Sequence, residues 1–355
     1  MPPFAALVAL YTLIFVLHVI VPGRWVAGYA RDEVSGDRLV YRLNGPRVLA
    51  IVVGLYFAGG ALGLFSWDYL YVHRWECMAS ACALGLVFTA AVVGGAPRRR
   101  GLAADLYLGR RADPQLLGGY VDAKMFLYLV GAAALQLNLL SYAAHHVMAY
   151  PGDPSPGVLV HVGLFSFFLW EYLFFEEVHL YTYDFVAERV GFKLGWGCLV
   201  FYPFFYAVGL GSTAALPNPG GAGLLPVWAG LFFAGWALAR GANLQKFRFK
   251  TAPGRVAFGV LRPEAIEAGG RRVLVSGFWG LSRHINYLGE IVMATALTLC
   301  LGYPGEWAPW LYPLYYLVLL VPRQIDDDRR CAAKYGALWE EYRRRVRWRI
   351  VPGLY

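Results

Sequence analysis

Three clusters of cationic, aromatic and amide side chains lie in the C-terminal third of this 355-residue sequence. They are residues 243–250, residues 277–290 and the tail 322–355, which holds nine Lys and Arg. Arg and Lys bind phosphates, and one arginine can bind two oxygens at once. Aromatic rings stack on nucleotide bases, while Asn and Asp hydrogen-bond to amides. These side-chain types, gathered in one region, would suit a dinucleotide.

The sequence contains no G-x-G-x-x-G motif, the glycine-rich turn with which Rossmann domains bind a pyrophosphate. A Rossmann domain is therefore excluded in practice. Any dinucleotide must instead be held by loops and by the ends of apolar segments. The side chains suited to this task are Lys246, Arg248, Lys250, Trp279, Asn286, Tyr287, Arg323, Asp327 and Lys334.

A second group of titratable residues follows the apolar segment 158–177. Glu177, Tyr181 and Asp184 are four and three residues apart, so on one continuous helix they would share a face. A carboxyl that faces an apolar cavity has a raised pKa, because desolvation disfavours the anion. A carboxyl beside a tyrosine would suit proton delivery, so these three residues are the candidate catalytic group. Alternatively, the charges only end the apolar segment.

The elements that must position these residues are apolar helices. The sequence is 58% hydrophobic and 15% charged, with a mean hydropathy of +0.47, whereas soluble proteins are about 45–50% apolar and 25% charged. Backbone polar groups in lipid must pair within their own segment, so we predict an all-α polytopic membrane protein. Apolar stretches of about 18 or more residues recur, and each of these is long enough to cross a layer of about 30 Å as a helix. The predicted spans are 4–22, 46–66, 76–95, 125–147, 158–177, 197–213, 223–240, 285–302 and 306–321.

The segments between the predicted spans alternate in charge. Segments 23–45, 96–123, 178–196 and 241–284 carry two to eight Lys and Arg, whereas each segment between them carries one at most. Cationic loops face the cytoplasm in membrane proteins. We therefore predict an outside N-terminus and a cytoplasmic C-terminus. The first apolar stretch has no basic residue before it, so we interpret it as a span and not as a signal peptide.

Other site classes are not expected. The five cysteines show no disulfide framework and no C-x-x-C pair, and the adjacent His145 and His146 would point about 100° apart on a helix. We therefore predict no metal site. The net charge of +9 reflects the loop asymmetry and would attract anionic lipid headgroups. Nucleic-acid binding is not expected, because no basic and aromatic module stands outside the spans.

Taken in order, the three clusters resemble the C-terminal signature of the membrane sterol reductases. That family includes the delta-14 and delta-7 sterol reductases, the fungal C-24(28) reductase and the reductase-like half of lamin B receptor. Its members carry N-x-Q-K, then G-W-W-G-x-x-R-H-x-N-Y-x-G-[DE], then R-x-x-x-D-x-x-x-C-x-x-K-Y-G-x-x-W-x-x-Y. The similar segments here are Asn243–Lys246, Gly277–Glu290 and Arg323–Tyr342, and Lys250 stands where the family usually has Arg.

The resemblance implies an NADPH-dependent enzyme of sterol biosynthesis. By this likeness, the residues that line the NADPH pocket would be Lys246, Lys250, Trp279, Asn286, Tyr287, Arg323, Asp327, Cys331, Lys334 and Tyr342. The alternative is that the aromatic residues and glycines of these motifs only pack the ends of the spans.

The N-terminal half resembles the family more loosely. Tyr41–Gly45 is similar to a Y-[KR]-L-N-G turn, and Glu176–Gly197 resembles the stretch that borders the sterol cavity. Asp105–Arg110 is similar to a D-x-[FY]-x-G-x loop that normally continues L-N-P-R. Here the continuation is Ala112–Gln115, a departure that bears on substrate and activity.

The resemblance implies reduction of a carbon–carbon double bond in a sterol, most similar to a delta-14 sterol reductase. Delta-7 or C-24(28) specificity is an alternative. An isolated alkene needs a proton before it accepts hydride, so the acid group would face the reduced nicotinamide across the cavity. The N-terminal bundle, residues 1–177, and the reductase part with sterol cavity and NADPH pocket, residues 178–355, would form one continuous membrane domain.

Two other functions stay open. Arg283–Gly289 resembles the R-H-P-x-Y-x-G of membrane methyltransferases that bind S-adenosylmethionine, although Ile285 replaces the proline. The third interpretation is a catalytically silent sterol-binding membrane protein.

The compact length favours a bacterial cytoplasmic membrane over the endoplasmic reticulum. The expected partners are the sterol and membrane lipid, and the sequence carries no signal for an oligomeric state.

Overall fold

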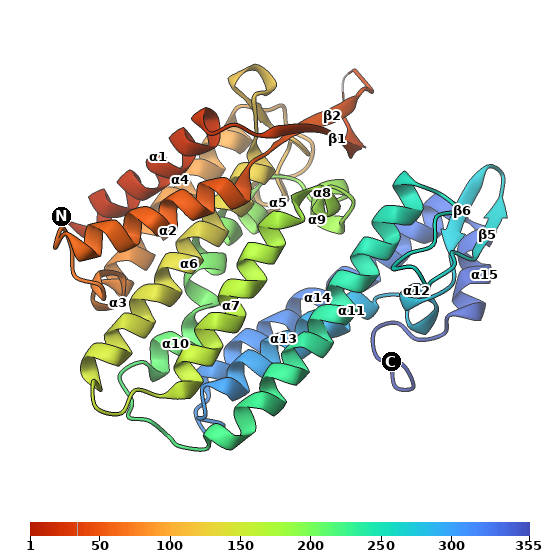
Figure 1. Ribbon diagram of the computed structural model, residues 1–355. Coiled ribbons are helices and arrows are strands. Elements are labelled where there is room, and N and C mark those ends of the chain that lie inside the picture. The colour runs from red at the N-terminus through yellow and green to blue at the C-terminus, as the bar shows by residue number, and fades with distance from the viewer. Residues whose placement is uncertain (34) are drawn as a thin grey trace. The chain divides into compact units, whose positions relative to one another are not determined.

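The computed structural model describes residues 1–33 and 35–355, which form two compact units, residues 1–220 and residues 221–355 (Figure 1). Within the described residues, six helices are long and apolar enough to cross a membrane. The expectation of a mostly helical, polytopic membrane protein is confirmed. The functional division at residue 177 stays a prediction.

Unit 1, residues 1–220, is organised around the long helix α6, whose side chains are mostly buried. Its helices are α1 (Pro3–Ile20), α2 (Gly45–Ala61), α3 (Tyr69–Val72), α4 (Arg74–Gly94), α5 (Leu102–Leu108), η1 (Leu117–Gly119), α6 (Ala123–Ala149), α7 (Pro156–Phe174), α8 (Glu176–His179), α9 (Tyr183–Val186), the π-helix η2 (Phe192–Phe205) and α10 (Val208–Thr213). Asp122 begins α6 by accepting a hydrogen bond from the Met125 N–H at 3.0 Å, a standard N-terminal cap. Helices α1, α2, α7 and η2 pack on α6, which therefore forms the centre of the unit.

Two antiparallel strand pairs complete unit 1. They are β1 (Arg24–Arg31) with β2 (Arg38–Leu43), and β3 (Gln115–Leu116) with β4 (Val121–Asp122). The β1–β2 hairpin lies beyond the ends of α1 and α2 (Figure 1). Its Arg42 is buried and donates to the carbonyls of His18, Val19 and Val21 at 2.6–2.7 Å. The last carbonyls of α1 have no partner within the helix, so this arginine stabilises the end of α1.

Unit 2, residues 221–355, consists of three long helices and a smaller region with a β-hairpin and short helices. Its elements are η3 (Ala222–Leu224), α11 (Leu225–Thr251), β5 (Ala265–Ala268), β6 (Arg271–Leu274), α12 (Phe278–Leu281), α13 (Ile285–Cys300), η4 (Ala308–Trp310), α14 (Leu311–Tyr335) and α15 (Ala337–Arg345). The β5–β6 hairpin packs on α15 through a core of buried apolar residues that includes Ile266, Val273 and Trp339.

All nine predicted spans fall on helical segments, but several boundaries differ. Helices α2 and α13 are apolar but only 17 and 16 residues long. Helix α11 continues to Thr251 and α14 continues to Tyr335, well past the predicted ends at 240 and 321. Hydropathy marks where a helix becomes polar, not where it stops. The cationic clusters 243–250 and 322–335 therefore lie on helical extensions.

Helices α11 and α13 pack with their backbones in direct contact. A Cβ atom placed on Gly289 would lie 2.5 Å from both the Gly235 carbonyl oxygen and the Ala239 nitrogen. A Cβ on Gly235 would lie 2.8 Å from the Gly289 carbonyl oxygen. Only glycine fits at such distances, so these two positions hold the helices together. Small residues allow the same close approach of membrane helices in general.

We expect Gly289→Ala to destabilise the protein by about 1–3 kcal/mol, because the added methyl must push the α11 backbone away. The measurement is the melting temperature of the protein in detergent. Gly230→Ala on α11 is the matched control, since its Cβ would meet nothing within 4 Å. Equal melting temperatures for the two variants would contradict the close packing at Gly289.

Candidate functional site

The end of α11 and the short helix α12 form one side of the candidate cofactor site, within unit 2. Lys246 Nζ lies 5.1 Å from the centre of the Trp279 ring, a cation–π contact. The Trp279 indole N–H donates to the Ala242 carbonyl at 2.8 Å, which fixes the ring against α11. The sequence predicted both residues for the site, and the structure brings them together.

The turn before α12 is held by Gln245, the glutamine of the N-x-Q-K motif. Its Oε1 accepts from the Phe278 N–H at 3.0 Å, and its Nε2 donates to the Ser276 carbonyl at 3.1 Å. Gly277 has a φ of +63°, and a Cβ there would lie 2.3 Å from Gln245 Nε2. This close approach and the left-handed backbone require glycine. Gln245 and Gly277 therefore position Trp279.

Tyr342, on α15, contacts the same region. Its hydroxyl donates to the Trp279 carbonyl at 2.9 Å, and the side chain is buried against Trp339 with ring centres 4.9 Å apart. Burial raises the pKa of Tyr342, so the phenol keeps its proton. Tyr342 thus lies at the predicted site, where its hydrogen bond supports the backbone of Trp279.

Helix α14 supplies two acids that hold the segment before α13. Asp327 Oδ2 lies 3.2 Å from His284 Nε2, and Asp328 Oδ1 accepts from Arg283 at 3.3 Å and from the Trp339 indole at 3.2 Å. Burial opposes the Asp327 anion, but the hydrogen bond to His284 and the nearby positive charges hold the Asp327 pKa below its usual value. A negative charge therefore remains at the centre of the site.

The same segment is also held by the C-terminal chain. The N–H groups of Arg283 and His284 donate to the carbonyls of Trp348 and Arg349 at 3.0 and 2.8 Å. The Ser282 hydroxyl donates to the Ile350 carbonyl at 2.9 Å. Chain segments more than sixty residues apart thereby fix the entry to α13, the helix that carries Asn286 and Tyr287.

The remaining predicted residues lie on the three helices around this point. The Asn286 amide donates to Asn243 Oδ1 at 3.4 Å, and the Tyr287 ring centre lies 5.0 Å from that of His284. Lys250 Nζ lies 3.5 Å from the Tyr335 hydroxyl, and Lys334 Nζ lies 5.2 Å from the Tyr335 ring centre. Tyr335 and His284 were not among the predicted site residues, although both lie inside the quoted motifs.

Cys331 and Arg323 lie on α14, on either side of Asp327. Cys331 packs against the apolar cluster of α15 and the β5–β6 hairpin. Burial, with a smaller contribution from the Asp327 charge, raises the pKa of the Cys331 thiol to about 12, so the group is neutral. Arg323 lies four residues before Asp327 and therefore one turn away on the same side of the helix.

The fit of this cluster to a phosphorylated dinucleotide rests on its unpaired buried atoms as well as on its cations. Neither His284 Nδ1 nor Asn286 Oδ1 has a hydrogen-bond partner within the part of the chain that the structure describes, and both atoms are buried. Buried polar atoms are nearly always paired, so such atoms at a cationic, aromatic surface point to a ligand. The side chains of this cluster therefore fit a phosphorylated dinucleotide.

The candidate acids lie in unit 1, and the prediction that they share one helical face is wrong. Glu177, Tyr181 and Asp184 do not share one helical face, because α8 ends at His179 and α9 begins at Tyr183. Between them the Thr182 hydroxyl donates to the His179 carbonyl at 2.7 Å, which closes a turn. The sequence spacing fitted a helix but carried no sign of this turn.

The three residues have separate surroundings. Glu177 pairs with Arg24 at 3.2 Å and is about a third exposed. Tyr181 packs against the Tyr29 ring, with centres 5.6 Å apart, and burial raises its pKa. Asp184 lies in α9. Their role in proton delivery stays a prediction.

The buried carboxyl of this region is Glu176. The residue is 5% exposed, and both carboxyl oxygens lie 3.1 Å from the Gly45 nitrogen at the start of α2, whose N–H donates to them. Burial raises the pKa of Glu176 to about 8, although the Gly45 hydrogen bond opposes the shift. Sequence reasoning left Glu176 out of the candidate catalytic group, and its partner lies 131 positions away, where no local pattern reveals it.

The segment Ala112–Gln115, which differs from the L-N-P-R of the family, makes buried polar contacts. Asp113 pairs with the fully buried Lys124 at 2.9 Å, and Gln115 donates to Asp122 at 2.5 Å. Lys124 also donates to the Phe185 carbonyl in α9 at 3.0 Å. The residues that depart from the family pattern thus take part in a buried network that joins α6 to α9.

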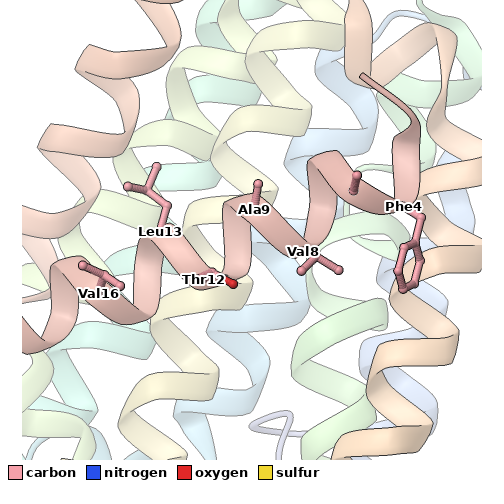
Figure 2. Close-up of a pocket in the computed structure, with 7 residues that line it drawn as sticks. Phe4, Val8, Ala9, Thr12, Leu13 and Val16 are labelled. Atoms are coloured by element: carbon pink, nitrogen blue, oxygen red, sulfur yellow. The ribbon is translucent and has the colours of Figure 1, made fainter.

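An open apolar hollow lies on the outward face of α1 (Figure 2). Figure 2 shows Phe4, Val8, Ala9, Thr12, Leu13 and Val16 along this single helix. The hollow contains none of the predicted site residues and no titratable side chain. Because α1 is apolar enough to cross a membrane, lipid chains suit this surface. The hollow therefore contributes nothing to the candidate chemistry.

No group of three or more His, Cys, Asp or Glu in residues 1–33 and 35–355 is arranged to hold a metal ion. The polar clusters described above are built instead from cations, aromatic rings and paired acids. Their chemistry suits anion and ring binding.

Comparison with known proteins covers nearly the whole chain. The model of the ergosterol biosynthesis ERG4/ERG24 family matches residues 3–355. Delta(14)-sterol reductase of Arabidopsis thaliana is 31% identical, over 99% of this chain and 97% of that protein. Delta(14)-sterol reductase of Methylotuvimicrobium alcaliphilum is 32% identical, over 96% and 80%. A probable 7-dehydrocholesterol reductase of Acanthamoeba polyphaga mimivirus is 27% identical, over 96% and 78%.

We expect the stability of the protein to fall as pH rises from about 5 to 8, through Glu176. Its pKa is about 8 when folded against 4.5 ordinarily, so the unfolded chain loses the proton first and is favoured as pH rises. One such proton changes the free energy of unfolding by at most about 1.4 kcal/mol per pH unit. Melting in detergent across this range measures the slope.

Glu176→Gln cannot ionise and should flatten that slope. Glu177→Gln is the matched control, because the neighbouring carboxyl is partly exposed and pairs with Arg24. An unchanged slope in Glu176→Gln would show that the buried carboxyl does not hold its proton.

Proposed function

This chain belongs to the ergosterol biosynthesis ERG4/ERG24 family and is a sterol reductase, and we propose that it reduces the delta-14 double bond of a sterol with NADPH. The motif-based resemblance to that family is confirmed by the match over residues 3–355. The cofactor, the position of the double bond and the order of proton and hydride addition belong to the proposal.

The observation that carries the proposal is the cation and aromatic cluster of unit 2. Lys246 lies over Trp279, Asp327 is held by His284, and buried polar atoms of His284 and Asn286 lack partners in the described chain. Phosphates would bind at Lys246, Lys250, Arg323 and Lys334. The Trp279 face would take a ring, and Asn286 would pair with a polar group of the ligand.

NADPH, when bound, supplies hydride. The protein must supply the proton, because an isolated alkene accepts hydride only after protonation. The proton and the hydride then add to the two carbons of the double bond, which becomes a single bond. Glu177, Tyr181 and Asp184 remain the proposed proton-donating group. Glu176 joins them as a buried carboxyl whose raised pKa keeps a proton available near neutral pH.

The delta-14 proposal follows the names of the relatives. Two proteins at 31% and 32% identity are named delta(14)-sterol reductase. The viral relative at 27% identity is named a probable 7-dehydrocholesterol reductase, which keeps delta-7 specificity as the second candidate. Assays with purified protein, NADPH and either a delta-14 or a delta-7 sterol separate the two by product analysis.

The other interpretations predict different ligands. A methyltransferase would bind S-adenosylmethionine, and a silent sterol-binding protein would bind neither cofactor. Membership of the sterol reductase family and the three C-terminal motifs favour the reductase. We also propose that the C-terminal cluster faces the cytoplasm, where the cationic loops place it.

We expect the purified protein to bind NADPH much more tightly than NADH, because the cluster holds more cations than a pyrophosphate needs. Arg323→Ala should weaken NADPH binding by about 1.5–3 kcal/mol if the arginine makes charged hydrogen bonds to phosphate. Titration calorimetry measures both quantities. Equal affinity for the two dinucleotides would argue against a 2′-phosphate contact.

We expect Asp184→Asn and Tyr181→Phe to lose sterol turnover and to keep NADPH binding, because both residues lie in unit 1, whereas the cofactor cluster lies in unit 2. General acid catalysis contributes about 10²–10⁴-fold, so the loss should be of that order. Glu176→Gln tests the buried carboxyl in the same assay. Near wild-type turnover in all three variants would exclude Asp184, Tyr181 and Glu176 as the proton donor.

A further inference from the structure

Gln324 is a buried residue whose polar atoms are unsatisfied. It lies on α14 next to Arg323, and the residue is 1% exposed. Neither its Oε1 nor its Nε2 has a hydrogen-bond partner among residues 1–33 and 35–355. A buried unpaired amide destabilises a folded protein, so a native amide in this state points to a partner that binds later.

Gln324 shares a face of α14 with the acids of the candidate site. Asp327 and Asp328 follow it by three and four residues, the spacing of neighbours on a helix surface. Those acids contact His284 and Arg283, immediately before α13. Helices α13 and α14 pack together, so Gln324 lies one turn from these contacts along the same side of the helix.

Other unpaired buried atoms lie at the same end of α13. His284 Nδ1 and Asn286 Oδ1 are buried without a hydrogen-bond partner in the described chain. Orphaned atoms therefore occur on both helices of one packed pair, beside the carboxylate of Asp327. Unsatisfied donors and acceptors on two helices that pack together are best explained by a polar ligand group.

We propose that Gln324 binds the carboxamide of the nicotinamide ring, an inference that rests on the proposed use of NADPH. A glutamine amide presents both a donor and an acceptor. A phosphate offers acceptors only, so it would leave Gln324 Oε1 unpaired. A carboxamide offers an N–H₂ group and a carbonyl and satisfies both atoms. Gln324 would thereby orient the nicotinamide ring near Asp327 and determine which face of the ring is turned toward the sterol.

The test replaces the amide by an apolar side chain of similar length. We expect Gln324→Met to weaken NADPH binding about tenfold or more, as the loss of two neutral hydrogen bonds predicts. Affinity for adenosine 2′,5′-bisphosphate, which has the 2′-phosphate and adenine but no nicotinamide, should stay within about twofold. Titration calorimetry with each ligand gives the two affinities.

A second readout needs no ligand. If the amide is kept for a ligand, Gln324→Met should leave the melting temperature of the ligand-free protein unchanged or higher, because a buried unpaired group has been removed. A structural role would lower the melting temperature instead. Gln324→Ala repeats both measurements with a smaller side chain, in case methionine does not fit.

Three outcomes overturn the inference. They are wild-type NADPH affinity in both variants, equal weakening of NADPH and adenosine 2′,5′-bisphosphate, and a lower melting temperature or failure to fold in both variants. Failure of the proposed function is a separate result, because the wild-type protein would then bind neither NADPH nor adenosine 2′,5′-bisphosphate.

Discussion

The backbone contact of α11 with α13 at Gly235 and Gly289 is the constraint on which unit 2 depends. With no side chain between them, the two helices are held in one register, which places Asn243 within hydrogen-bond distance of Asn286. The chain that leads into α13 carries His284, which in turn meets Asp327 of α14. A shift of α13 would therefore disturb the site on two other helices at once.

Charge pairing explains why so many ions are tolerated in and near an apolar bundle. Asp105 with Arg110 and Asp113 with Lys124 are buried pairs at 2.8 and 2.9 Å, and such charges need their partners to stay folded. In unit 2 the acids of α14 meet His284 and Arg283, while Lys246 lies over an aromatic face. The resulting surface combines positive charge with flat rings, which is the chemistry that a phosphorylated dinucleotide requires.

The two neighbouring glutamates of α8 show how packing separates residues that look alike in sequence. Glu177 is partly exposed and paired with Arg24, so its charge is compensated. Glu176 is buried against the first N–H of α2 and has a raised pKa. A sequence pattern places both acids beside the end of α7, but only the tertiary structure shows that Glu176 is the buried one.

Hydropathy and motif spacing are local properties of the chain, so the sequence alone predicted the class of fold, the six helices that are long and apolar enough to cross a membrane and the segments of the candidate cofactor cluster. Tertiary structure alone decided that α11 and α14 continue as helices through their polar ends, that a turn after Leu180 separates Glu177 from Asp184, and that hairpins flank the bundles. It also decided burial and pairing. Contacts such as Gly45 with Glu176 join residues 131 positions apart, and no local pattern encodes a partner at that distance.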